Sequence, residues 1–130
     1  MKRIVEKLQK AEAVMAVEKG AFDLFALFLR ENSPNKWDLL IAADWIDQDK
    51  VGAIKYVAGK VQSLLSKDEL LCLSRIVTIE ESNSALIDFH GTYNVEHGST
   101  EIQNSNLFGQ QINHAYLITS KRRNSIQTVS

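Results

Sequence analysis

The sequence predicts a single domain with an α+β fold, and three observations support this. Apolar residues recur at helical spacing in several segments, whereas β-branched and aromatic residues form shorter runs between them. Turn-forming residues separate two pairs of these runs, which is typical of β-hairpins. A chain of 130 residues can bury one hydrophobic core. We therefore expect a layer sandwich in which roughly three to four helices pack on a mixed or antiparallel sheet of about five strands, formed by two hairpins and one further strand.

The first third of the chain is predicted to form a helix and a hairpin. Residues 3–19 carry apolar side chains at helical spacing, and Gly20 follows them as a helix-ending glycine. Residues 21–30 and 37–45 are apolar and aromatic, and residues 32–35 between them have strong turn character. We interpret these two runs as the strands of a β-hairpin.

The first strand of this hairpin is apolar on both of its faces. One alternating set contains Phe22, Leu24, Ala26 and Phe28, and the other contains Phe25, Leu27 and Leu29. A single layer of helices covers one face, so the second face needs further helices, a loop or another copy of the protein. We therefore expect a homodimer. A helix over residues 21–31 is the competing interpretation of this segment.

The middle of the chain is predicted to contain two helices and a strand. Asp47 or Asp49 caps a helix whose apolar stripe continues to residue 65. A capping box at residues 66–69, with serine first and glutamate last, starts a second, short helix. Residues 75–80 are rich in β-branched side chains and are predicted to form a strand inside the sheet.

Residues 82–93 have helical spacing and are interpreted as a helix, although Gly91 also permits a strand over residues 92–96. No repeat, low-complexity block or linker divides the chain. Residues 1–120 are therefore expected to form one globular domain, and the polar residues 121–130 are expected to form a flexible C-terminal tail.

The second hairpin is predicted from alternating side chains in residues 100–103 and 111–120. Residues 104–106 and Gly109 separate these segments and are turn formers. Amide side chains gather in the same stretch around Phe108, at positions Asn104, Asn106, Gln110, Gln111 and Asn113. Such a stretch offers hydrogen bonds to a peptide, a sugar or a base, but it is also typical of a polar loop.

Charge and cysteine content argue against several classes of protein. The formal net charge of −1 gives no field that would draw the whole molecule onto nucleic acid or an acidic membrane. Cys72 has no partner for an internal disulfide, which favours a reducing compartment. No apolar run approaches the roughly 20 residues that cross a bilayer, and charges interrupt any signal-peptide core near Met1. We expect a cytoplasmic protein without a membrane partner.

The motifs of several enzyme classes are missing. The sequence has no GxGxxG fingerprint, no glycine-rich loop ending in Lys-Ser or Lys-Thr, and no GxSxG elbow. His90, His97 and His114 lack the spacing of a zinc-binding helix, and Cys72 has no CxxC partner. We therefore expect no cofactor, and the sequence assigns no catalytic residue.

Asp23 and Asp44 form the sharpest candidate site. A symmetric hairpin about residues 31–36 places these two carboxylates opposite each other. Opposed carboxylates repel, so a divalent metal or a shared proton is needed to stabilise the pair. A one-residue slip would place them on opposite faces. With His97 or His114 as a further ligand or acid, the pair would suit a metal-dependent hydrolase such as a phosphoesterase.

Basic residues at both ends of the chain form a second candidate site. The last strand is followed by Lys121, Arg122 and Arg123, and the N-terminal segment carries Lys2, Arg3, Lys7 and Lys10. Converging termini would gather these side chains into a phosphate-binding patch, as in a nucleic-acid-binding accessory protein. Interleaved glutamates and the lack of an aromatic residue beside the C-terminal run favour ordinary solvated charge instead.

These features favour a small cytoplasmic protein-interaction or regulatory domain that has no catalytic activity and forms a homodimer. No motif identifies its protein partner. The alternatives are the metal-dependent hydrolase that uses Asp23 and Asp44 and the nucleic-acid-binding accessory protein that uses the basic ends. Whether the chain is an enzyme stays open at this point.

Overall fold

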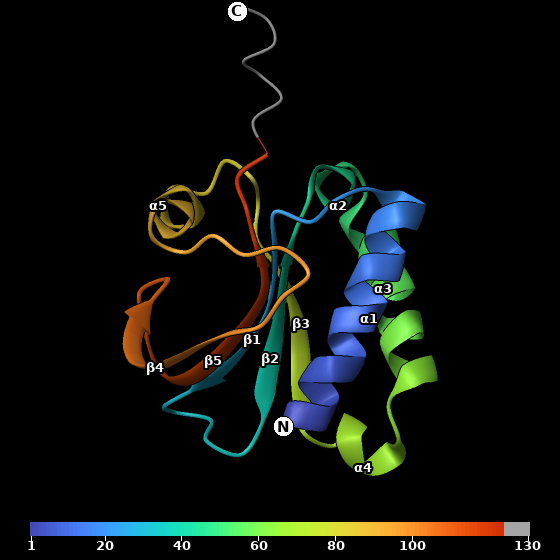
Figure 1. The fold of residues 1–130 in the computed structure, drawn as a ribbon, viewed down its shortest axis with the longest axis horizontal. Helices are drawn as coiled ribbons and strands as arrows, with labels where there is room; N and C mark the ends of the chain where they lie inside the picture. The colour runs from blue at the N-terminus through green and yellow to red at the C-terminus, as the bar shows by residue number, and fades with distance from the viewer. Residues whose placement is uncertain (124–130) are drawn as a thin grey trace, which may run out of the picture.

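The computed structural model describes residues 1–123, which form an α+β domain on one open, five-stranded sheet (Figure 1). The strands are β1 (Leu24–Arg30), β2 (Trp37–Ala42), β3 (Leu73–Thr78), β4 (Thr100–Leu107) and β5 (Gln110–Ser120). The helices are α1 (Lys2–Lys19), α2 (Asp44–Gln48), α3 (Lys50–Leu64), α4 (Lys67–Leu70) and α5 (Ser84–Thr92). The predicted fold class, helices packed on a mixed sheet of five strands, is confirmed.

The sheet has the strand order β3-β2-β1-β5-β4. β2 and β3 are parallel, and the other neighbouring pairs are antiparallel. Parallel neighbours need a crossover connection, which the segment carrying α2, α3 and α4 supplies. Both predicted hairpins are present, and pairing of β1 with β5 joins them. Because Leu24 pairs with Ser120, the start of β1 lies beside the end of β5.

One face of the sheet is covered by α1 and α3 (Figure 1). Leu8 and Met15 on α1 and Val57 on α3 are fully buried and belong to one cluster with Phe25 and Ile41 of the sheet. Leu8 and Met15 lie two helical turns apart, so both point to the same side of α1. The apolar side chains whose spacing predicted these helices are therefore the ones that pack on the sheet.

The opposite face is covered by α5 and by the curled hairpin of β4 and β5 (Figure 1). Leu86 and Phe89 of α5 form a second buried cluster with Leu24, Ala26 and Phe28 of β1. Both apolar faces of β1 are therefore buried within the chain itself. An uncovered apolar face, which was the reason to expect a homodimer, does not exist on β1. The oligomeric state itself stays an untested prediction.

Local signals located two helix starts. The Asp49 side chain accepts a hydrogen bond of 3.0 Å from Gly52 N at the start of α3, so Asp49 is the cap of the predicted pair. Ser66 and Glu69 form the predicted capping box at α4, in which each side chain bonds the other residue's backbone N–H. Both caps act within one helical turn, which explains why sequence alone located them.

Several strand boundaries differ from the prediction: β1 begins at Leu24 and not at residue 21, β3 spans Leu73–Thr78 and not residues 75–80, and the ends of β2 and β4 also differ. The second strand ends at Ala42 because the chain enters α2 at Asp44, where two acidic residues in the first turn favour a helix N-terminus. β4 continues through residues 104–106 instead of turning there. Asn104 adopts a left-handed φ of 49° inside β4, and the register of the pairing with β5 is the same on both sides of it.

The alternative interpretations of two segments are wrong. Residues 21–31 contain β1 and no helix, and α5 extends to Thr92, so only an isolated bridge from Val95 to Ser120 remains of the alternative strand. Of the predicted tail, residues 124–130 lie outside the described residues. Within residues 1–123, no helix combines the length and the apolar character needed to cross a membrane.

Candidate functional site

The predicted pairing of Asp23 with Asp44 is wrong by one residue. β1 and β2 pair Leu24 with Ala42, and Asp23 N donates a hydrogen bond of 2.7 Å to Ala42 O. Asp44 lies two residues beyond Ala42, the last paired residue of β2, where it begins α2 and accepts a hydrogen bond from Gln48 Nε2 at 3.0 Å. The two carboxylates therefore do not face each other across a hairpin.

Asp23 instead lies among other acidic groups at the end of the sheet. The residue is 3% exposed, and burial together with a hydrogen bond to Glu81 raises the pKa of its carboxyl to about 8. The charge of Asp47, whose Oδ2 accepts a hydrogen bond from Glu81 N at 3.1 Å, acts in the same direction. The Arg123 guanidinium lowers this pKa but does not outweigh burial. Asp23 therefore keeps its proton to a higher pH than an ordinary aspartate does.

A metal role for Asp23 and Asp44 gains no geometric support from these neighbours. Among residues 1–123, no group of three or more histidine, cysteine, aspartate or glutamate side chains is placed to hold a metal ion. Because Asp23 and Asp44 are not opposed in the hairpin, the repulsion that called for a metal ion or a shared proton does not arise between them. Metal binding stays an untested prediction.

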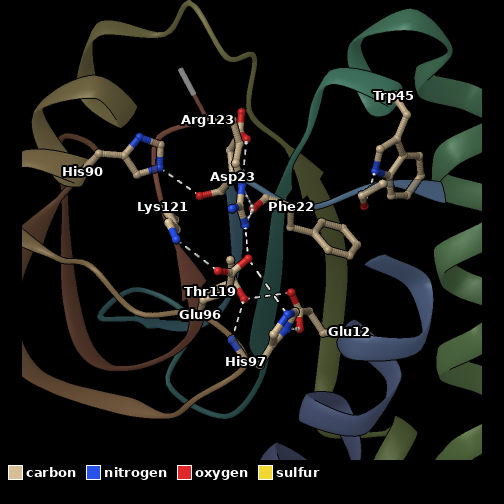
Figure 2. A network of polar contacts seen from close by, with 11 residues as sticks. Glu12, Phe22, Asp23, Trp45, His90, Glu96, His97, Thr119, Lys121 and Arg123 are labelled. Carbon is tan, nitrogen blue, oxygen red and sulfur yellow. Dashed lines mark hydrogen bonds and ion pairs between the residues drawn. The ribbon is translucent and has the colours of Figure 1, made fainter. Parts of the chain in front are cut away.

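Two of the three basic residues at the C-terminus are bound by Glu96 (Figure 2). Lys121 Nζ lies 3.2 Å from Glu96 Oε1, and Arg123 Nη2 lies 2.5 Å from Oε2. Arg123 also donates hydrogen bonds of 3.2 and 2.9 Å to Phe22 O. Hydrogen bonding to Arg123 lowers the pKa of Glu96. Arg122 is exposed. A nucleic-acid role for Lys121, Arg122 and Arg123 stays a prediction.

His97 is held by a buried glutamate from α1 (Figure 2). Its Nδ1 lies 2.5 Å from Oε1 of Glu12, which is fully buried, and Thr119 Oγ1 donates a hydrogen bond of 2.7 Å to Glu12 Oε2. The His97 backbone has a φ of 52° and donates to Thr119 Oγ1. These contacts satisfy both oxygens of a carboxylate that would otherwise be buried at high cost.

The other two histidines lie at separate places. His114 bonds to Glu101 on the neighbouring strand and packs against Trp37, with ring centroids 5.4 Å apart. His90 Nε2 lies 2.8 Å from Asp23 O, and burial lowers the pKa of its imidazole. Neither His97 nor His114 forms a hydrogen bond or ion pair with the carboxylate of Asp23 or Asp44 among the contacts within residues 1–123.

The β4–β5 turn presents an aromatic side chain in an unfavourable backbone conformation. Leu107 pairs with Gln110, so Phe108 and Gly109 form a two-residue loop. Their φ values of 53° and 75° are both left-handed, which is the pattern of a type I′ turn. Asn-Gly is favoured there, and a residue with a Cβ costs about 1–2 kcal/mol. The turn alone therefore gives no reason for phenylalanine at this position.

The contacts of Phe108 supply that reason. Its ring centroid lies 5.9 Å from that of Phe28 on β1 and 5.2 Å from that of Phe89 on α5, while the side chain stays partly exposed. Two hollows with volumes of about 220 and about 350 Å³ adjoin it. Ala85, Leu107 and Phe108 line both hollows, so Phe108 contributes to the walls of each.

The smaller hollow combines an apolar floor with one charged end. The sheet contributes the floor, and α5 and the β4–β5 turn contribute the walls. Its apolar lining consists of Phe28, Leu40, Val77, Ile79, Ala85, Leu107 and Phe108. Its charged lining consists of Arg30, Asp38 and Arg75, which come from three neighbouring strands. Concave apolar surfaces with a few polar groups are the usual form of ligand sites.

Strand pairing assembles the charged end. Asp38 on β2 pairs with Phe28 on β1 and with Arg75 on β3, and Arg30 lies two residues beyond Phe28 on the same face. Asp38 is 2% exposed and accepts a hydrogen bond of 2.7 Å from Arg30 Nε. Arg75 Nε lies 3.4 Å from Asp38 Oδ1. The buried carboxylate thus faces two guanidinium groups, and all three side chains belong to the sheet.

Sequence reasoning missed this hollow because Arg30, Asp38 and Arg75 are far apart in the chain and carry no motif. The amide-rich stretch around Phe108 was the signal that pointed to this region, and Gln110 from that stretch lines the hollow. No family model, curated protein or solved structure matches this chain. Function therefore has to be inferred from the geometry of the hollow and its charged end.

Proposed function

We propose that this chain is a recognition domain that binds a small apolar ligand non-covalently in the hollow between the sheet and α5. The observation that carries this proposal is Phe108, which occupies an unfavourable turn conformation beside a partly open aromatic hollow. Unfavourable backbone conformations persist where the surrounding structure compensates, and they cluster at binding sites. The ring of Phe108 forms part of the wall that a ligand would contact.

The size and lining of the hollow set the class of ligand. Its volume of about 220 Å³ is below the roughly 300–1,000 Å³ typical of sites for drug-sized molecules, so the ligand is smaller than these. Its floor is aromatic and aliphatic, and burying such surface contributes about 25 cal/mol per Å². A short apolar molecule therefore fits better than a large polar one.

This proposal keeps the class of function expected from the sequence, an interaction or regulatory domain without catalytic activity in the cytoplasm. The proposed contact surface is the hollow and not an uncovered face of the sheet, and the proposed ligand is a small molecule and not a protein. A homodimer is not required by it, and sedimentation velocity measures that point separately. The hydrolase alternative predicts stabilisation by magnesium or manganese that Asp23→Asn abolishes.

Titration of the protein with 1-octanol, followed by NMR spectra of the backbone amides, tests the proposal. We expect shifts confined to residues that line the hollow. Ala85→Phe should abolish them, because a ring at this half-buried position would fill the hollow. The matched control is Ala58→Phe, at a half-buried position on α3, which should leave binding unchanged. Shifts spread over the whole surface, or none, would contradict the proposal.

A further inference from the structure

The charges at the end of the hollow do not cancel. Arg30 and Arg75 contribute two positive charges, and Asp38 contributes one negative charge. The remaining lining residues are uncharged, so one positive charge is left uncompensated in the lining. Beside an apolar floor, a charge interacts more strongly with an opposite charge than it does in water. An anionic group on the ligand would therefore be attracted to this end.

The two arginines differ in how firmly they are held. Arg30 donates to Asp38 Oδ2 at 2.7 Å and to Asn32 Oδ1 at 3.2 Å, and its side chain is 19% exposed. Arg75 reaches Asp38 only at 3.4 Å, beyond the usual range for N–H···O hydrogen bonds, and its side chain is 53% exposed. Arg30 is thus committed to Asp38, whereas Arg75 has donors available for a further acceptor.

Guanidinium geometry favours a carboxylate as that acceptor. Two parallel N–H groups of an arginine match the two oxygens of a carboxylate, and such charge-assisted pairs are stronger than neutral hydrogen bonds. Asp38 limits the choice further, because a ligand with two or more negative charges would bring one of them close to this buried carboxylate. A single negative charge matches the excess charge of the site.

We propose that the ligand of the hollow is a small monocarboxylic acid with an apolar body, whose carboxylate binds Arg75 while its body lies against Phe28, Val77 and Phe108. This inference rests on the proposed function, since it names the chemistry of the ligand at the same site. Asp38 and Arg30 act as positioning residues, because they hold the charged end of the hollow in place.

Isothermal titration with octanoate, 1-octanol and octylamine tests the inference. These probes share an eight-carbon chain and differ in the charge of one end. We expect octanoate to bind at least about tenfold more tightly than 1-octanol, which corresponds to about 1.4 kcal/mol, and octylamine to bind more weakly than either. The preference for octanoate should decrease as salt is added, because the Arg75 side chain is half exposed.

Variants then assign the preference to one residue. Arg75→Gln should bring octanoate to the affinity of 1-octanol without changing the affinity for 1-octanol. Arg75→Lys should restore only part of the preference, because lysine lacks the paired donors. The matched control is Arg3→Gln, which removes an exposed arginine from α1 and should leave all three affinities unchanged.

The outcomes separate this inference from the proposed function. Equal binding of octanoate and 1-octanol to the parent protein, or a preference that survives Arg75→Gln, would overturn the carboxylate assignment and leave the hollow as an apolar site. Failure of both probes to bind the parent would overturn the proposed function as well. Because the probe comparison uses the parent protein, it decides the question even if Arg75→Gln does not fold.

Discussion

On one side of the sheet, the 18-residue α1 and the 15-residue α3 bury a continuous cluster of large side chains, whereas on the other side the nine-residue α5 and a curled hairpin adjoin two hollows. Both sides contain fully buried residues from β1, such as Phe25 and Leu24. The difference therefore lies in the covering elements and not in the strands. A hollow of about 200 Å³ also lies among α1, α2 and α3, but no strand residue lines it, whereas the sheet itself lines the hollow beside Phe108.

The largest expected effect comes from placing a charge on each side. Val57→Asp should prevent folding, because Val57 is fully buried between α3 and the sheet and an unpaired carboxylate there is very costly. Ala85→Asp, on the wall of the hollow, should leave the protein folded, since its carboxylate can reach water. Circular dichroism of the two variants measures the contrast. Unfolding of both would show that the hollow side is as closed as the other.

Truncation of one leucine on each side should give a smaller difference in the same direction. Leu8→Ala and Leu86→Ala remove the same atoms from positions that are 0% and 1% exposed, and each should cost about 2–5 kcal/mol. Leu8→Ala should lie near the upper limit, because long helices enclose the cavity it leaves. Side chains beside the hollow can move into the space left by Leu86. Urea unfolding of both variants checks the order, and equal costs would contradict it.

A pH-dependent effect is expected at the end of the sheet, where Asp23 lies beside Glu81. The folded protein keeps a proton on Asp23 up to a pKa of about 8, whereas an aspartate in the unfolded chain loses it near 3.8. The folded state thus binds the additional proton between these values, and stability falls as pH rises through this interval. Asp23→Asn should remove this loss. Towards pH 8, its free energy of unfolding should therefore rise relative to that of the parent by more than about 1 kcal/mol, or several degrees in Tm.

Thermal melts of the parent and Asp23→Asn over this pH interval provide the measurement. The control is Asp44→Asn, which changes an exposed aspartate at the start of α2. The difference in Tm between Asp44→Asn and the parent should not vary with pH in the same way. A constant difference for Asp23→Asn would mean that Asp23 is ionised in the folded protein, and the acidic surroundings would then need another explanation.

The smallest effect on stability is expected at Phe108. Phe108→Asn should relax the left-handed turn but lose the ring contacts with Phe28 and Phe89, which are worth about 0.5–1.5 kcal/mol each. The net change should stay within about 1 kcal/mol, while binding of 1-octanol should be lost. Gly109→Ala serves as the control for backbone cost, because no atom lies within 4 Å of the added Cβ. A large loss of stability in Phe108→Asn would assign the ring to the core.

Features that depend on neighbouring residues were predictable from sequence. The caps at Asp49 and Ser66, the helix of residues 3–19 and the two hairpins all follow from signals that lie within short stretches of sequence. The fold class follows from them, because amphipathic helices must bury their apolar side on a sheet. The α2 helix was not predicted, since its few residues continue the apolar run of β2.

The candidate sites could not be predicted in this way, because they depend on contacts between distant segments. A register shift of one residue separates Asp23 from Asp44, and only the return of the chain after β3 brings Glu81 next to Asp23. The ion pairs of Lys121 and Arg123 likewise depend on where the loop carrying Glu96 lies.

The sequence by itself therefore determined the helices, the hairpins and their combination into one α+β domain, because local spacing, caps and turns act over a few residues. Tertiary structure decided which elements cover each face of the sheet, which acidic residues lie near Asp23, and that Arg30, Asp38 and Arg75 meet beside Phe108. The physical reason is that strand order and register are selected by the total burial of apolar surface over the whole chain. This total depends on contacts between distant segments, so no short stretch of sequence predicts it.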